Sequence, residues 1–198
     1  MRFLSFFLLL TIISCETAEP EVNLSYPEVD SSIKKETIDS NTLELFTSIE
    51  GEFSIHMPSK PIKDIHTTSS EIGEIKLTQY IHSKNNTQAW LVSHSDYPPK
   101  MIQIGNNTKL LSGIKYRVLK SLGAKTIFEH NIKLKEKYNG LAFVAHTDKK
   151  NMDIMYQIYL VNNRVYQLSM YSSIGPITKK DSLDFFGSFK LLAKKQDL

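Results

Sequence analysis

The sequence contains one cysteine, one tryptophan and eight glycines among its 198 residues. A single cysteine excludes an internal disulfide bond and any metal site built from several thiolates. With 41% hydrophobic and 23% charged residues, the chain is too apolar to be disordered throughout. Its length suits little more than one domain, so we expect one folded unit.

Signatures of catalysis and cofactor binding are also missing. The sequence has no G-x-S-x-G elbow, H-E-x-x-H helix, phosphate-binding glycine loop, dinucleotide-binding glycine pattern or calcium loop. His94, Ser95 and Asp96 have the residue types of a catalytic triad, but neighbours on a strand face opposite sides of a sheet. No two histidines are two residues apart, as metal ligands on one strand would be, or four apart, as ligands on one helix would be. We therefore expect structural or solvent-exposed side chains at all six: His56, His66, His82, His94, His130 and His146. We therefore expect no catalytic residues, no metal and no cofactor.

The strongest local signal is an apolar run near the start of the chain. Arg2 is followed by almost unbroken apolar residues from Phe3 to Ile13. As a helix this run would extend about 16 Å, which is short of the ~30 Å hydrocarbon core of a bilayer. The run therefore predicts a signal peptide and not a membrane span.

The residues that end this run resemble a bacterial lipobox. The sequence reads Ile12-Ile13-Ser14-Cys15, with aliphatic residues and a small residue ahead of the only cysteine. The resemblance implies cleavage after Ser14 and attachment of a diacylglyceryl group to the Cys15 thiol. Two or three acyl chains make a stable anchor, so we expect a mature protein held on a membrane of the cell envelope.

Residues 16–43 are acidic and poor in sustained apolar pattern. They contain seven acidic residues against two lysines: Glu16, Glu19, Glu21, Glu28, Asp30, Glu36 and Asp39, with Lys34 and Lys35. Such a composition predicts a tether and not a packed core. The expected organisation is a signal peptide over 1–14, the lipidated Cys15 with its tether to residue 43, and a folded domain over 44–198.

Short apolar runs separated by turn signals predict strands in this domain. The expected strands are 45–49, 53–57, 62–69, 75–82, 89–96, 127–138, 141–147, 154–161 and 164–171. Turn signals stand at 85–86, at Asn139-Gly140 and at 162–163. A two-residue turn at Asn139-Gly140 would place His130 opposite Lys149 and His146 opposite Lys133. A two-residue turn at 162–163 would place Tyr159 opposite Tyr166 and Leu160 opposite Val165.

Two segments have helical spacing. The first begins at an N-cap, Asn107 or Thr108, and ends at Gly123. The second begins near Thr178 or Asp181 and is expected to carry Leu183, Phe186 and Phe189 on one face. The sequence therefore predicts an α+β domain, in which an antiparallel sheet of about seven to nine strands is flanked by two helices.

Four segments of this domain resemble the PsbP-like family in their order and spacing. They are residues 51–61 (GEFSIHMPSKP), 93–98 (SHSDYP) ahead of an amphipathic helix, 163–168 (NRVYQL) and 185–191 (FFGSFKL). The family includes bacterial envelope lipoproteins, and its members mostly act by docking to other macromolecules, with no catalytic residue set in common. The resemblance implies a PsbP-like fold and, by analogy, a binding role.

Positive charge is concentrated in the middle of the chain. Residues 44–198 carry 21 basic and 14 acidic residues, and the segment 100–137 alone has nine basic residues against two acidic ones. We expect a docking face formed by one helix and the following strand, with these residues: Lys109, Lys115, Arg117, Lys120, Lys133, Lys135 and Lys137. On a strand, Lys133, Lys135 and Lys137 would share one side. The face would serve either solubility or docking of an acidic envelope protein or anionic headgroups, and nucleic acid is not expected outside the cytoplasm.

Three functions fit these patterns. The first is a lipid-anchored binding or assembly module of the cell envelope without catalytic activity. The others are an envelope carrier of a small hydrophobic ligand and a hydrolase whose residues are scattered through the sequence. An interior apolar cavity would favour the carrier, and a cleft joining a histidine, a carboxylate and a hydroxyl would favour the enzyme.

Overall fold

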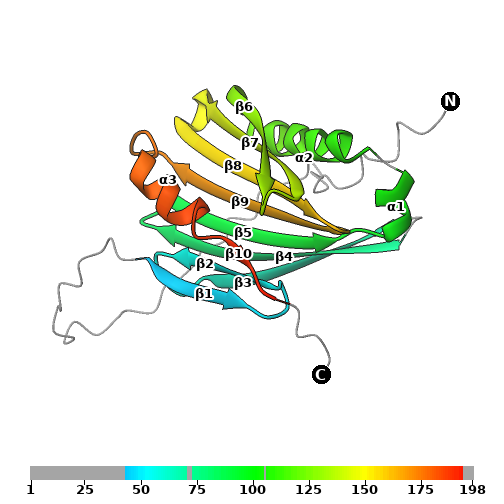
Figure 1. Cartoon of the computed structure of the whole chain (residues 1–198). Coiled ribbons are helices and arrows are strands. Elements are labelled where there is room, and N and C mark those ends of the chain that lie inside the picture. Colours follow the sequence, from blue (N-terminus) through cyan, green and yellow to red (C-terminus); the bar gives the residue numbers. More distant parts are fainter. Residues whose placement is uncertain (1–42, 71–72, 105, 194–198) are drawn as a thin grey trace, which may run out of the picture. The chain divides into compact units, whose positions relative to one another are not determined.

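The computed structural model describes residues 43–70, 73–104 and 106–193 (Figure 1). The chain divides into two compact units, residues 1–42 and 43–198, and all the described residues belong to the second. The expected lipobox Ile12-Ile13-Ser14-Cys15 and the acidic segment 16–42 lie outside the described residues. Within the described part of the chain, no helix is long and apolar enough to cross a membrane.

The described unit contains ten strands, three α-helices and one short 3-10 helix. In chain order these are β1 (Glu44–Ser48), β2 (Phe53–Met57), β3 (Ile62–Ser70), β4 (Gly73–Lys84), β5 (Gln88–Asp96), α1 (Pro99–Ile104), α2 (Asn107–Leu122), β6 (Lys125–Leu134), β7 (Tyr138–Thr147), η2 (Asp148–Lys150), β8 (Met152–Val161), β9 (Arg164–Ser172), α3 (Lys179–Phe186) and β10 (Lys190–Leu191). The α+β class with antiparallel strands is confirmed.

The strands form two antiparallel sheets. The large sheet has seven strands in the order β3-β4-β5-β9-β8-β7-β6, and the small sheet has three in the order β1-β2-β10. The sequence predicted nearly all of these strands, but placed them in a single sheet. The sheets are separate because β1 and β2 pair with each other and not with the large sheet, and β10 then adds to β2 as the third strand.

Each face of the large sheet has its own hydrophobic core. On one face, Phe53 and Ile55 of the small sheet and Phe185 of α3 pack against residues such as Leu168. On the other face, α2 buries Leu110, Leu111 and Ile114 against apolar side chains of β7, β8 and β9. Adjacent residues of a strand point to opposite faces, so β9 contributes to both cores.

Two of the three predicted turns form where they were expected. At 162–163, Tyr159 lies opposite Tyr166 and Leu160 lies opposite Val165, as predicted. The β4–β5 connection turns at Asn85 and Asn86, with positive φ angles of 51° and 56°. Asparagine tolerates this left-handed conformation, which is why it signals such turns.

The turn predicted at Asn139-Gly140 is wrong. The chain turns at Lys135 and Glu136, with φ angles of 51° and 54°, and β7 has begun by Tyr138. A Cβ atom on Gly140 would lie 2.6 Å from the carbonyl oxygen of Ile158, so this position requires a close backbone approach inside the sheet and not a turn.

The predicted pairs around that turn are wrong for the same reason. His130 lies opposite Ala142 and His146 opposite Lys125.

Both predicted helices form, with corrections at their ends and faces. Asn106, and not Asn107 or Thr108, caps α2, because its side chain accepts hydrogen bonds from two backbone N–H groups of the first turn. Gly123 ends α2 with a φ of 62°, as expected.

In α3, Thr178 is the N-cap, but Leu183, Phe186 and Phe189 do not form the one apolar face that was predicted. Leu183 is 60% exposed, and Phe185 is buried together with Phe186. Phe189 is buried but follows the helix. The short helix α1 was not predicted.

Candidate functional site

A groove of about 520 Å³ lies between α2 and the hairpin formed by β6 and β7. It forms because α2 packs chiefly over β7 and β8, while most residues of β6 stay exposed. Its lining combines polar and apolar residues: Thr108, Leu111, Ser112, Asn131, Ile132, Lys133, Glu136, Asn139, Gly140 and Leu141. The groove can therefore hold a polypeptide segment that carries both kinds of side chain, and no histidine lines it.

Several lysines of the predicted docking face stand at this groove. Lys133 lines it, and Lys109 follows the lining residue Thr108 at the start of α2. Lys135 and Lys137 are exposed in the turn between β6 and β7. These four residues, Lys109, Lys133, Lys135 and Lys137, are called the basic rim below.

Other members of the predicted face are engaged or distant. Lys115 is only 19% exposed and forms an ion pair with Glu129 of β6. Arg117 is half-buried beside Tyr97, whose phenol pKa is raised by burial and partly lowered again by this guanidinium. Lys120 is exposed on the last turn of α2, about 16 Å along the helix from Lys109.

The expectation that Lys133, Lys135 and Lys137 share one side of a strand is wrong. Strand β6 ends at Leu134, so Lys135 and Lys137 belong to the turn. The left-handed conformation of Lys135 breaks the alternation on which that expectation rested. The turn nevertheless keeps all three lysines at the same end of the hairpin.

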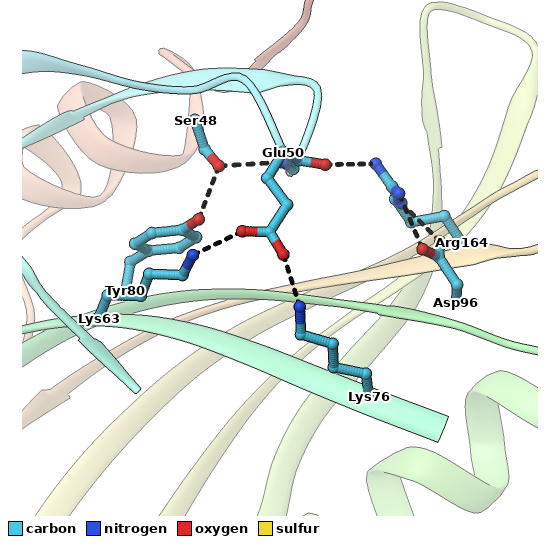
Figure 2. Close-up of polar contacts among 8 residues, drawn as sticks. Ser48, Glu50, Lys63, Lys76, Tyr80, Asp96 and Arg164 are labelled. Atoms are coloured by element: carbon cyan, nitrogen blue, oxygen red, sulfur yellow. Dashed lines mark hydrogen bonds and ion pairs between the residues drawn. The ribbon is translucent and has the colours of Figure 1, made fainter. Parts of the chain in front are cut away.

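A second polar site lies on the opposite face of the sheet, where the turn between β1 and β2 contacts the sheet (Figure 2). The Glu50 carboxylate accepts hydrogen bonds from Lys63 of β3 at 2.5 Å and from Lys76 of β4 at 2.8 Å. Hydrogen bonding to these ammonium groups lowers the pKa of Glu50 to about 2. The carboxylate is therefore an ionised anchor and not a proton donor near neutral pH.

Arg164 of β9 holds the same turn from the other side. Its guanidinium donates to both carboxylate oxygens of Asp96, at 2.6 and 2.8 Å, and to the backbone carbonyl of Glu50 at 3.1 Å. The Tyr166 hydroxyl donates to the carbonyl oxygen of Gly51 at 2.8 Å. The hydrogen bonds to Asp96 raise the pKa of Arg164, so its charge is permanent. We call the Glu50 and Arg164 contacts together the turn latch.

Beneath the turn latch lies a buried pair of polar side chains. His94 of β5 and Thr78 of β4 are opposite each other in the sheet, and the His94 ring lies 6.3 Å from that of Tyr80 and 6.4 Å from that of Phe53. The His94 Nε2 and Thr78 Oγ1 atoms have no hydrogen-bond partner among the described residues. Burial lowers the pKa of His94 to about 4, so this imidazole is neutral at pH 7.

The turn latch was not predicted from the sequence. The sequence indicated residues 50–52 only as the connection between the expected strands 45–49 and 53–57, and Arg164 is separated from Glu50 by 114 positions. The one available signal was the acidic and glycine composition of that turn, which does not name its partners. Ser95 lies on the face opposite to His94, as expected, so the three consecutive residues from His94 to Asp96 do not form a triad.

The remaining histidines do not assemble a metal site. His146 pairs with Asp153 at 2.7 Å and lies 3.8 Å from Asp148. Among the described residues, no group of three or more histidine, cysteine, aspartate or glutamate side chains is placed to hold a metal ion.

Comparisons with known proteins give little further information. No family model and no curated protein matches the chain. Among solved structures, it is similar to a Pseudomonas aeruginosa protein of unknown function described as a putative regulator, with 9% sequence identity and a TM-score of 0.34. The match covers 71% of this chain and 85% of that one. A likeness this low assigns neither a fold family nor an activity.

Proposed function

We propose that this chain is a lipid-anchored protein of the bacterial cell envelope, with a PsbP-like domain that binds an acidic partner protein and catalyses no reaction. The anchor rests on the lipobox-like residues Ile12, Ile13, Ser14 and Cys15. The binding role rests on one observation, the groove between α2 and the β6–β7 hairpin with its basic rim.

The charge of the basic rim favours an acidic partner. Lys109, Lys133 and Lys135 are exposed and form no ion pair with a described residue, whereas Lys115 is neutralised by Glu129. An exposed cluster of one sign attracts and orients a partner of the opposite sign. The single acidic residue that lines the groove is Glu136.

The groove also favours binding over the two alternative functions. A carrier of a hydrophobic ligand needs an enclosed apolar cavity, whereas this groove is open and polar residues stand among its apolar ones, including Lys133 and Glu136. The expected hydrolase would need a cleft that joins a histidine, a carboxylate and a hydroxyl, and no histidine lines this groove.

Charge reversal in living cells tests this proposal. A photoreactive residue at the groove-lining Ser112 would crosslink the bound partner, which mass spectrometry would then identify and quantify. Changing Lys133, Lys135 and Lys137 together to glutamate should lower the yield of the crosslinked partner by about tenfold or more.

The matched control changes Lys60, Lys179 and Lys190 to glutamate. These lysines are also exposed, but they lie after β2, in α3 and in β10, away from the groove. This variant should keep the wild-type yield, and both variants should keep the wild-type circular dichroism. Equal yields from the two triple variants, or a captured partner without acidic surface segments, would overturn the proposal.

A further inference from the structure

The strand that borders the groove is a free edge of the large sheet. β6 stands at the end of the strand order and pairs only with β7 among the described strands (Figure 1). An edge strand directs a row of unpaired N–H and C=O groups outward, which can pair with a further strand. The first seven residues of β6 are exposed, including Ile127 at 67% and Phe128 at 57%.

The two sides of β6 differ in chemistry. Glu129, Asn131 and Lys133 lie on the side of α2, since they alternate with residues of the other face and two of them line the groove. On the opposite side, Phe128 lies near His130, and Ile132 packs at the border of the hydrophobic core beneath the small sheet. A strand added beside β6 would therefore meet polar and basic groups on one side and apolar groups on the other.

The other edge of the large sheet lacks this combination. In β3, Lys63 is paired with Glu50, and Asp64 lies 2.7 Å from His66. The charges of Lys63, Asp64 and His66 are thus balanced locally, and no residue of β3 lines the groove. Of the two edge strands of the large sheet, only β6 combines unpaired backbone N–H and C=O groups with a neighbouring groove and the basic rim.

We propose that an extended acidic segment of the partner protein adds to β6 as an eighth strand of the large sheet. Its acidic side chains would point towards the α2 side and meet the basic rim, and its alternate, apolar side chains would cover Phe128 and Ile132. The irregularity between Thr126 and Phe128 limits regular pairing to the part of β6 that follows it. Main-chain hydrogen bonds would give affinity and the alternating side chains would give specificity. This inference rests on the proposed function, and it names the form that the partner takes.

A synthetic peptide of five Glu-Val repeats tests the inference, because it alternates acidic and apolar residues and is long enough to span the regular part of β6 from Phe128 to Leu134. Binding to the full mature chain in detergent would be measured by calorimetry, and the amide exchange of β6 by mass spectrometry. We expect the peptide to slow exchange in β6 and to leave exchange in β3 unchanged. A Lys-Val peptide of the same length is the control for charge and should bind at least about tenfold more weakly.

Backbone methylation separates strand addition from simple charge attraction. In a strand pair, only alternate residues direct their N–H groups to the neighbour. Methylating the peptide nitrogens of one alternate set should therefore weaken binding by about tenfold or more, and methylating the other set should have little effect.

The possible failures are distinguishable. If both methylated peptides bind as well as the parent, or if β6 exchange does not change, or if no peptide binds at up to about 1 mM, strand addition is overturned. The proposed function would still stand if the Lys133, Lys135 and Lys137 variant loses its crosslinked partner in cells. If that variant keeps its partner, the proposed function itself fails.

Discussion

The buried imidazole of His94 makes the stability of the domain sensitive to mild acid. His94 is 4% exposed, and burial lowers its pKa from 6.5 to about 4. Between these two values the unfolded chain binds a proton at this position and the native chain does not. The contribution of the neutral ring to stability is therefore complete above pH 6.5 and is lost as the pH falls towards 4.

Replacing His94 by glutamine should remove this part of the pH dependence. A pKa difference of this size corresponds to about 3 kcal/mol, so the wild type should lose up to about that much more unfolding free energy than His94→Gln between pH 7 and pH 4. Urea unfolding at several pH values measures the difference. His56→Gln, at an exposed position of β2, is the control and should follow the wild type.

The charged groups around His94 act in a different pH range. Arg164, Asp96, Glu50 and Lys76 are the charges that influence it. The pKa of Glu50 is lowered from 4.5 to about 2, so its stabilising contribution is lost only below pH 4.5. If the wild type and His94→Gln lose the same free energy between pH 6.5 and pH 4.5, His94 is not the source of the sensitivity.

At the scale of the elements, Gly140 shows why a local turn signal can mislead. Asparagine followed by glycine is a strong hairpin signal, but this glycine is required by β8, the next strand along the chain. A methyl group at this position would meet the carbonyl oxygen of Ile158 and the ring of Tyr159, each at 2.6 Å. That requirement depends on packing between strands, which a two-residue pattern does not contain.

Changing Gly140 to alanine should therefore destabilise the domain. Overpacking of this kind costs about 1–3 kcal/mol, and we expect a loss within that range in urea unfolding at pH 7. Gly113 is the matched control, because it lies inside α2 and a Cβ atom there meets nothing within 4 Å. Gly113→Ala should stabilise the domain by about 0.5–1 kcal/mol. A Gly140→Ala variant as stable as the wild type would show that the sheet adjusts freely at this point.

The other elements were easier to predict because their signals are local and complete. Alternating apolar residues predict strands, and Gly123 correctly predicted the end of α2. The observed N-cap of α2 is Asn106, one residue before the nearer predicted cap at Asn107. Both residues are asparagines and both side chains are able to cap, so the sequence alone did not distinguish them. The pairing of strands that are distant in sequence, such as β5 with β9, could not be predicted from local patterns and is known only from the structure.

For the whole molecule, charge predicted a basic face, but tertiary contacts decided which lysines are available. Lys115 is neutralised by Glu129 of β6, and Arg117 lies beside Tyr97. The groove itself exists because α2 packs chiefly over β7 and β8 and leaves most of β6 exposed, and the periodicity of α2 does not specify which strands it covers. The sequence therefore identified the residue types of the candidate site and missed its shape.

We expect Cys15 to attach this domain to a membrane. In the wild type, we expect the mature chain to begin at Cys15 and to carry a lipid on the thiol, because the lipobox-like segment ends at that residue. Cys15→Ser should abolish lipidation and retain residues 1–14, since the hydroxyl does not replace the thiol as the acyl-glyceryl acceptor. Mass spectrometry of the N-terminal peptide distinguishes the two products. Ser14→Ala keeps a small residue before the cysteine and should be processed like the wild type. A wild-type chain with an unmodified N-terminus at any other residue would contradict the anchor, and it would leave the groove and its basic rim to be explained without a membrane.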